Sequence, residues 1–138
     1  MITAVDTSVL IDVFGADLRF GAASASSLRT SLNEGAVVAC SVVWAETRGA
    51  FASDEDFARA MDTLGVRFSA MQEEAAILAG LTWKKYRVAG GKRDRVIADF
   101  LIGAHAAKQC DRLLTHDRGY YGKNFSGLTI VDTSITLE

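Results

Sequence analysis

Four acidic residues stand where a folded protein rarely places an unpartnered carboxylate, namely Asp6, Glu46, Asp99 and Asp117. Asp6 and Asp117 follow apolar, strand-like runs of sequence. Glu46 and Asp99 fall on the apolar faces of expected helices, at about 100° per residue. A buried carboxylate without a partner costs several kcal/mol, so four converging carboxylates are tolerable only around a cation. The pattern therefore predicts a divalent-metal site, and a carboxylate metal site indicates phosphate chemistry.

Each of these carboxylates also has a structural explanation. Asp6 and Asp117 could each be a helix N-cap or a turn residue, which is the commoner role of a lone aspartate at such a place. Glu46 and Asp99 could each pair with a buried arginine. Such explanations suit one residue at a time and account poorly for four acids in compatible places. They remain open for each residue, while the set of four favours the metal site.

Small hydroxyl side chains accompany two of the acids. Ser8 lies two residues after Asp6, and Thr115 lies two residues before Asp117. A hydroxyl at such a position can hold a carboxylate or a metal-bound water in place, although helix capping and strand termination explain it equally well. His116 adjoins Asp117 and could touch a substrate.

The elements that must position these residues alternate along the chain. Five apolar runs are expected as strands: Met1–Val5, Ala36–Cys40, Val66–Phe68, Arg112–Leu114 and Leu128–Val131. Caps, breakers and periodicity place helices between them: Asp6 to Phe14, Leu18–Leu32, Ser41 onward through Glu46, Ser53 to Gly65, Glu73–Tyr86 and Val96–Cys110. The alternation predicts an α/β sandwich around a mainly parallel sheet. Ligands of such sheets bind beyond the carboxyl ends of the strands, where Asp6 and Asp117 fall.

Composition limits the class of protein. The chain has 138 residues, 49% of them hydrophobic, and it fits a single domain over residues 1–138. No apolar run is long enough to span a membrane and no secretory signal is visible, so a cytoplasmic protein is expected. The net charge of −2 does not by itself indicate a nucleic-acid binder, so such a role requires a local basic patch.

Two cysteines and one histidine are expected to have no chemical role. Cys40 and Cys110 lack metal-ligand spacing and are expected as core thiols in a reducing cytoplasm. His105 falls on the polar arc of its helix, which predicts a solvent-facing side chain. No glycine-rich phosphate loop and no nucleophile-elbow sequence occurs, so P-loop and serine-hydrolase chemistry are not indicated.

Four sequence blocks carry the acids: Val5-Asp6-Thr7-Ser8, Trp44-Ala45-Glu46, residues 98–106 and residues 114–119. In this order and spacing, the blocks resemble the PIN-domain ribonucleases, in particular the VapC-type toxins of bacterial toxin–antitoxin pairs. The resemblance spans the whole chain, and its most specific block is the one in the long helix. Members of the family often carry proline just before the helical aspartate, where this chain has Ala98. That difference affects how the helix begins and leaves the acids in place.

The resemblance implies a PIN-like α/β/α sandwich and an endoribonuclease that uses Mg²⁺ or Mn²⁺. All four acids would then be catalytic, with Asp6, Asp99 and Asp117 as metal ligands. Glu46 would ligate the metal directly or through water, and the metal would activate a water and polarise the scissile phosphate. The resemblance further implies a homodimer and a small antitoxin protein that inserts a segment into the active-site groove.

Basic residues cluster in one segment close to the helical aspartate. Residues 84–95 contain six of the fifteen basic residues, including Lys92, Arg93 and Arg95. Because this segment leads into the helix of Asp99, it predicts an RNA-binding rim beside the metal site. Tyr86 interrupts the run and could stack on an unpaired base. The alternative is a solvated helix end whose lysines interact favourably with the helix dipole.

Other functions fit the sequence less well. An α/β phosphoacceptor signalling domain would carry paired acids after the first strand and a lysine after the last, whereas Thr7 and Ser8 follow Asp6. A haloacid-dehalogenase-like phosphatase would need an aspartate in place of Ser8. A PIN-type RNA-processing nuclease without an antitoxin would keep the same site. A non-catalytic relative that binds RNA or protein would have no need of all four acids.

Overall fold

A parallel sheet of five strands forms the centre of the computed structural model, which describes residues 1–92 and 96–133. Each neighbouring pair of strands runs parallel, in the order β3-β2-β1-β4-β5. The strands are β1 (Ile2–Val5), β2 (Ala36–Cys40), β3 (Val66–Ser69), β4 (Arg112–Thr115) and β5 (Thr129–Asp132). The predicted α/β architecture is confirmed, and no predicted strand end differs from the observed one by more than one residue.

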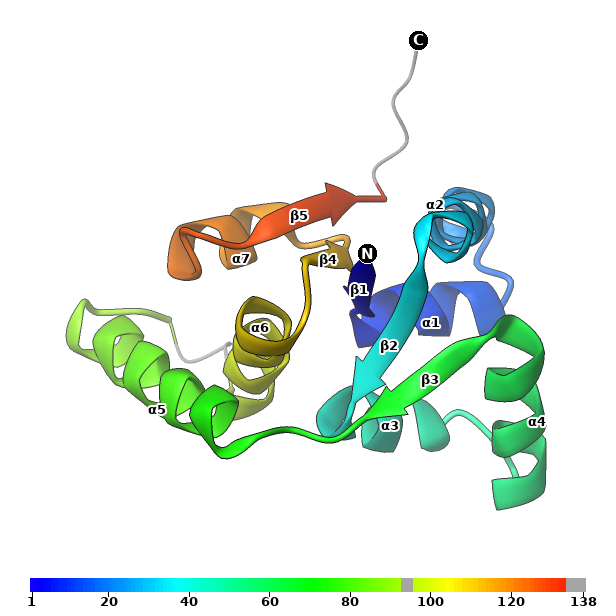
Figure 1. Ribbon diagram of the computed structural model, residues 1–138, viewed down its shortest axis with the longest axis horizontal. Helices are drawn as coiled ribbons and strands as arrows, with labels where there is room; N and C mark the ends of the chain where they lie inside the picture. The colour runs from blue at the N-terminus through cyan, green and yellow to red at the C-terminus, as the bar shows by residue number, and fades with distance from the viewer. Residues whose placement is uncertain (93–95, 134–138) are drawn as a thin grey trace, which may run out of the picture.

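Helices cover both faces of the sheet. Figure 1 shows α1 and α2 on one side of the strands and α5 and α6 on the other, which is the predicted sandwich. No helix among the described residues has the length and apolar character needed to cross a membrane. The described helices are α1 (Thr7–Phe14), α2 (Gly21–Glu34), α3 (Ser41–Arg48), α4 (Asp54–Leu64), α5 (Glu73–Val88), α6 (Ile97–Gln109) and α7 (Arg118–Asn124).

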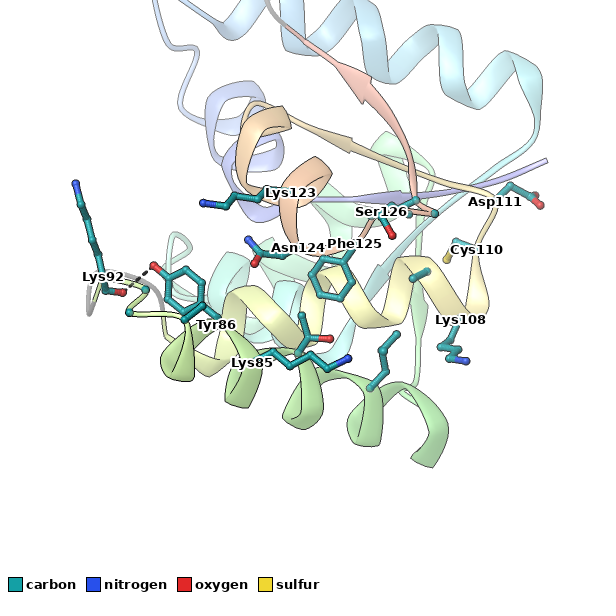
Figure 2. Close-up of a pocket in the computed structure, with 18 residues that line it drawn as sticks. Lys85, Tyr86, Lys92, Lys108, Cys110, Asp111, Lys123, Asn124, Phe125 and Ser126 are labelled. Carbon is teal, nitrogen blue, oxygen red and sulfur yellow. Dashed lines mark hydrogen bonds between the residues drawn. The ribbon is translucent and has the colours of Figure 1, made fainter.

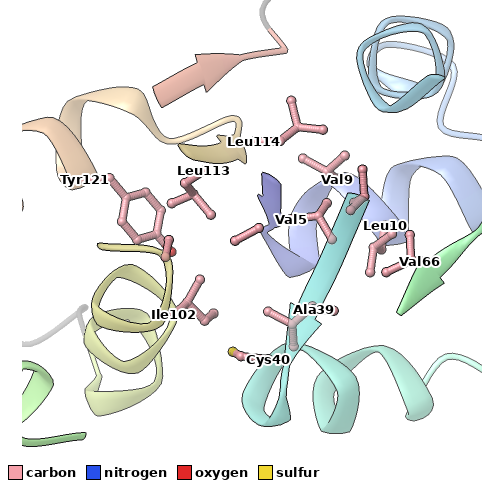
Figure 3. Close-up of a cluster of buried hydrophobic side chains, with 14 of the residues drawn as sticks. Val5, Val9, Leu10, Ala39, Cys40, Val66, Ile102, Leu113, Leu114 and Tyr121 are labelled. Carbon is pink, nitrogen blue, oxygen red and sulfur yellow. The ribbon is translucent and has the colours of Figure 1, made fainter. Parts of the chain in front are cut away.

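The core fills both faces of the central strands. In Figure 3, Ile102 and Tyr121 lie on one side of β1, and Val9 and Leu10 lie on the other. All four side chains are at most 3% exposed. Strands buried on both faces need continuous apolar sequence, which explains why the runs that form β1, β2 and β4 could be recognised as strands.

The helix α7 is not predicted by the sequence. Its seven residues include two glycines, which are poor helix formers, and they show no apolar periodicity. Tyr120 and Tyr121 are nevertheless buried, and the Tyr120 ring packs edge-on against Phe100 of α6 with ring centroids 5.5 Å apart. Packing on α6 therefore stabilises a helix that local propensity does not specify.

The prediction that His105 faces solvent is wrong. The side chain is only 1% exposed, and its Nε2 lies 2.8 Å from the hydroxyl of Ser69 at the end of β3. The sequence alone did not show that the chain following β3 covers the polar arc of α6. Burial lowers the pKa of His105, so the ring is neutral at pH 7 and suits its place in the core.

Both cysteines are free thiols, as expected. Cys40 is buried and Cys110 is half-buried. Burial raises the pKa of both thiols, that of Cys110 to about 12, so neither is a reactive thiolate near neutral pH.

Candidate active site

The four acidic residues singled out by the sequence line one cavity of about 420 Å³. Asp6 follows β1, Asp117 follows β4, Glu46 lies on α3 and Asp99 lies in the first turn of α6. The ladder between β1 and β4 fixes the first two, because the Asp6 amide donates to the Leu114 carbonyl at 3.0 Å. The cavity thus opens at the carboxyl edge of the sheet, where ligands of such folds bind.

Asp6 is the most buried of the four acids, with 8% of its surface exposed. It is the N-cap of α1, where its Oδ1 accepts a hydrogen bond from the Thr7 amide at 2.8 Å. Its Oδ2 accepts a hydrogen bond from the Thr115 hydroxyl at 2.7 Å. Burial raises the pKa of Asp6, and the nearby charges of Asp99 and Glu46 act in the same direction, while the two hydrogen bonds oppose them. A cation at this site would relieve both destabilising effects.

Thr115 connects two of the acids through one buried hydroxyl. Besides donating to Asp6, its Oγ1 accepts a hydrogen bond from the backbone amide of Asp117 at 3.0 Å. The predicted contact between Thr115 and the acids is therefore present. Ser8 also lines the cavity and is exposed, and among the described residues its side chain has no hydrogen bond to a neighbour. Ser8 thus stands near the acids without holding one.

Thr7 is the hydroxyl that sequence reasoning passed over. Its Oγ1 donates to Oε1 of Glu46 at 2.7 Å, which links α1 to α3 across the cavity. The residue stands between Asp6 and Ser8, where it could have been found, but a threonine after an N-cap is commonly assigned to capping alone. Glu46 itself is exposed rather than packed, because the buried side of α3 is centred on Val43 and Thr47. The prediction that Glu46 lies on a covered, apolar face of its helix is therefore wrong, although its side chain reaches the cavity.

Asp99 and Asp117 are both half-buried at the beginning of a helix. Asp99 occupies the first turn of α6, where its Oδ2 accepts a hydrogen bond from the Val96 amide at 3.3 Å. Asp117 is the N-cap residue of α7. The partial positive charge of a helix N-terminus stabilises a nearby carboxylate. Asp117 thus occupies the helix-start position considered from the sequence, whereas such a position was not considered for Asp99, and both residues line the cavity.

His116 lines the cavity as well, next to Asp117. Its ring nitrogens are hydrogen-bonded to the carboxylate of Asp12 on α1 and to the hydroxyl of Thr133 after β5. The hydroxyl of Ser24 on α2 lies 3.2 Å from its Nε2. This network ties the loop between β4 and α7 to α1 and α2. Since both nitrogens have protein partners, the ring supports the cavity wall more directly than it faces a substrate.

The donor set suits a hard divalent ion, because carboxylate oxygens are the ligands that Mg²⁺ and Mn²⁺ prefer. In the part of the chain that the structure describes, no group of three or more His, Cys, Asp or Glu side chains is placed so that it could hold a metal ion. Mg²⁺ usually retains several waters and is bound through one or two carboxylates and substrate phosphates. The residues present therefore fit such an ion by chemistry, without forming a complete protein ligand shell.

The basic segment next to α6 is described in part. Lys92 is exposed, and its carbonyl accepts a hydrogen bond from the Tyr86 hydroxyl at 2.8 Å. Tyr86 also packs against Phe100 with ring centroids 5.3 Å apart, and a Cβ at Gly91 would lie 2.4 Å from its ring. Tyr86 thus anchors the loop at Gly91 and Lys92, and its stacking on an unpaired base stays a prediction. Two of the predicted RNA-binding residues, Arg93 and Arg95, lie outside the described residues.

Comparison with known proteins supports the fold described above. Residues 3–125 match the family model of the PIN domain. Among solved structures, VapBC2 from Rickettsia felis bound to a promoter DNA fragment is 15% identical, with a TM-score of 0.73 over 96% of this chain and 98% of that chain. VapBC-1 from nontypeable Haemophilus influenzae is 20% identical, with a TM-score of 0.72 over the same shares. A toxin–antitoxin complex from Klebsiella pneumoniae is 16% identical, with a TM-score of 0.65 over 97% and 99%. No curated protein matched the sequence.

Proposed function

The chain belongs to the PIN domain family, which indicates a nuclease, and from this premise we propose that it is a divalent-metal-dependent endoribonuclease acting as the toxin of a toxin–antitoxin pair. The observation that carries the proposal is the gathering of Asp6, Glu46, Asp99 and Asp117 around one cavity at the carboxyl edge of the sheet. Four carboxylates there would repel a phosphate unless a cation accompanied it. Hydrolysis of a phosphodiester with the help of such a cation would account for four carboxylates at one site.

Mg²⁺ or Mn²⁺ would be held at Asp6, Asp99 and Asp117, with one or two of them as direct ligands and the rest acting through water, while Glu46 would bind directly or through water. When bound, the ion would neutralise the carboxylates and stabilise the negative charge that develops on the scissile phosphate. Thr115 keeps one oxygen of Asp6 oriented, and Thr7 does the same for Glu46. Ser8, exposed at the cavity wall, is available to a phosphate or a water. The protein residues thus orient the acids before any substrate arrives.

RNA would enter beside the segment that precedes α6. Lys92, Arg93 and Arg95 lie a few residues before Asp99 in the sequence. Cations at the rim would attract the RNA backbone by releasing its counterions, which allows a protein of net charge −2 to bind a polyanion. Tyr86 supports this role indirectly, because its hydrogen bond to the Lys92 carbonyl holds the start of the loop.

A small antitoxin protein would neutralise the enzyme in the cytoplasm. The solved structures with the same fold include VapBC complexes and a toxin–antitoxin complex, which supports a partner of this kind. An acidic cavity is complementary to an inserted arginine, whose guanidinium pairs with carboxylates through two hydrogen bonds and can displace a metal. A homodimer is part of the same proposal.

Cleavage of labelled RNA by the purified chain tests the nuclease proposal. We expect cleavage with Mg²⁺ or Mn²⁺, none with excess EDTA, and none with the Asp99→Asn variant. Asp62→Asn is the matched control, because Asp62 is an exposed carboxylate on α4, away from the cavity lining. If EDTA left the activity intact, or if Asp99→Asn cleaved as fast as the control, the proposed site would be wrong.

Co-expression tests the toxin proposal separately. The chain expressed alone should arrest growth, and expression together with the small protein encoded beside it should relieve the arrest and yield an inactive complex. If the chain were an active nuclease but no protein encoded beside it bound to it, the nuclease proposal would stand and the toxin proposal would fail. That outcome would favour a PIN-type RNA-processing nuclease without an antitoxin.

A further inference from the structure

A second, larger cavity of about 930 Å³ lies between α5, α6 and α7 and shares no lining residue with the acidic cavity. Four of the five lysines in the chain line it, namely Lys85, Lys92, Lys108 and Lys123. We call this cavity the lysine groove. Figure 2 shows Lys85 on α5 below the groove and Lys123 on α7 above it, with Lys92 and Lys108 at its two ends. Sequence reasoning did not connect Lys108 and Lys123 to the basic segment, because they follow it by 13 residues or more.

The lysine groove carries a surplus of positive charge. All four lysines are exposed, and none forms an ion pair with another described residue. Asp111 is the one carboxylate among the described residues of the lining, and its Oδ2 already accepts a hydrogen bond from the Ile2 amide at 2.6 Å. Four like charges around one hollow repel one another, and a bound anion would remove that repulsion.

Helix stability explains part of this arrangement but not all of it. Lys85, Lys108 and Lys123 each lie in the last turn of their helix, where a cation interacts favourably with the helix dipole. The dipole gives no reason for Lys92, which lies in the loop after α5, to join them. It also gives no reason for the chain to place four of its five lysines around one cavity while its net charge is negative.

The lysine groove and the acidic cavity are joined by two shared helices. The helix α6 carries Asp99 in its first turn and Lys108 in its last turn, while α7 follows Asp117 and carries Lys123 in its last turn. Nine residues separate Asp99 from Lys108, which corresponds to about 14 Å along the helix axis. An extended polyanion that passes the acids could therefore continue along α6 and α7 into the lysine groove.

We propose that the lysine groove binds backbone phosphates of a single-stranded RNA, at nucleotides several positions away from the bond that is cleaved. This inference rests on the proposed function, since it takes RNA as the substrate at the acids. Lys92 lines the lysine groove and also a neighbouring cavity whose lining includes Val96 and Ile97, at the start of the helix that carries Asp99. This link toward the acids favours the RNA over an acidic segment of a protein partner, which would need no path to the acids.

A charge-matched pair of triple variants tests the proposal. In the first, Lys85, Lys108 and Lys123 are changed to Gln. In the second, three exposed arginines remote from the lysine groove are changed to Gln: Arg29, Arg59 and Arg67. Both variants change the net charge by the same amount. Binding is measured in EDTA with a labelled, unstructured RNA of about 20 nucleotides, longer than the ~4–16 nucleotides that compact single-strand sites cover.

We expect the lysine variant to lower the slope of log K against log salt by about 2, because each lost phosphate contact removes about 0.7 for single strands. If counterion release no longer contributes to binding near 1 M salt, this decrease in slope corresponds to RNA binding about 100-fold weaker at 0.1 M salt. The arginine variant should change the slope and affinity far less. Thermal melting of both variants shows whether they fold. If the triple lysine variant does not fold, RNA binding is measured with the single variant Lys123→Gln.

The possible outcomes separate the two proposals. Equal losses of RNA affinity in both triple variants would mean that only the net charge of the protein matters. That result would overturn the proposed role of the lysine groove. Unchanged RNA binding together with lost binding of a polyglutamate peptide would assign the groove to a protein partner and also overturn it. In either case metal-dependent cleavage by the wild type would leave the nuclease proposal standing. If instead the wild type bound RNA through the groove but never cleaved it, the nuclease proposal alone would fail.

Discussion

Replacing Thr115 by valine removes one hydroxyl from the acidic site and leaves the shape of the side chain almost unchanged. The residue is fully buried, so no water can take the place of the hydroxyl. Two hydrogen bonds are lost: the one donated to Asp6 at 2.7 Å and the one accepted from the Asp117 amide at 3.0 Å. The variant therefore loosens two acids at once without creating a cavity.

The magnitude follows from the two bonds. A hydrogen bond to a charged group contributes about 1.5–3 kcal/mol and a neutral one about 0.5–1.5 kcal/mol, so the free energy of unfolding should fall by about 2–4 kcal/mol. For a domain of this size that corresponds to a drop in melting temperature of about 10 °C. If Asp6 ligates the metal, losing the group that orients it should also weaken metal affinity about 10–100-fold.

Thermal melting with and without Mg²⁺, together with RNA cleavage, measures both effects of the Thr115→Val change. Thr115→Ser is the matched control, because serine keeps the hydroxyl and should restore most of the stability and the response to Mg²⁺. A valine variant that melted within about 2 °C of the wild type and kept its response to Mg²⁺ would refute the reasoning. It would mean that neither hydrogen bond contributes to holding Asp6 or Asp117.

Two further predictions concern Asp6 and Gly103. Because the pKa of Asp6 is raised above its usual 3.8, the folded metal-free protein binds a proton more readily than the unfolded chain. Its stability should therefore rise as the pH falls through the raised pKa, with the gain complete below 3.8, and melting curves of Asp6→Asn should lack this rise. A Cβ at Gly103 would lie 2.3 Å from the Phe125 ring, so Gly103→Ala should lower the free energy of unfolding by about 1–3 kcal/mol. Denaturant unfolding checks this against Gly80→Ala on α5, where nothing lies within 4 Å of the added methyl group and stability should not fall.

The fold could be predicted where the burial of an element requires a recognisable pattern of residues. Strands covered on both faces need uninterrupted apolar runs, so β1, β2 and β4 could be recognised without any structure. The helix α7 could not be recognised, because its glycines disfavour a helix and its tyrosines become informative only when α6 is in place. The helix α7 is stabilised by packing against residues distant in the sequence, and the local sequence pattern carries no signal of that packing.

The site was predictable to the same extent. Asp6 and Asp117 follow neighbouring strands, and the carboxyl ends of parallel strands meet at one edge, so their convergence follows from the alternation of elements. The faces of helices were harder to assign. Glu46 is exposed although an apolar face was expected, and His105 is buried although a polar arc was expected. A helical wheel gives the direction of a side chain, but which direction is covered depends on neighbours that arrive from elsewhere in the chain.

The distance between the two charged surfaces bears on why the acids would need a metal at all. Asp99 and Lys108 are about 14 Å apart along α6, which exceeds the screening length of about 8 Å at physiological salt. In the proposed arrangement the lysines would therefore attract RNA without neutralising the carboxylates. A phosphate drawn in by the lysine groove would still meet uncompensated negative charge at Asp6 and its neighbours. If the proposals hold, binding of the polyanion and tolerance of its phosphate at the acids would be separate tasks, and the second would fall to the proposed cation.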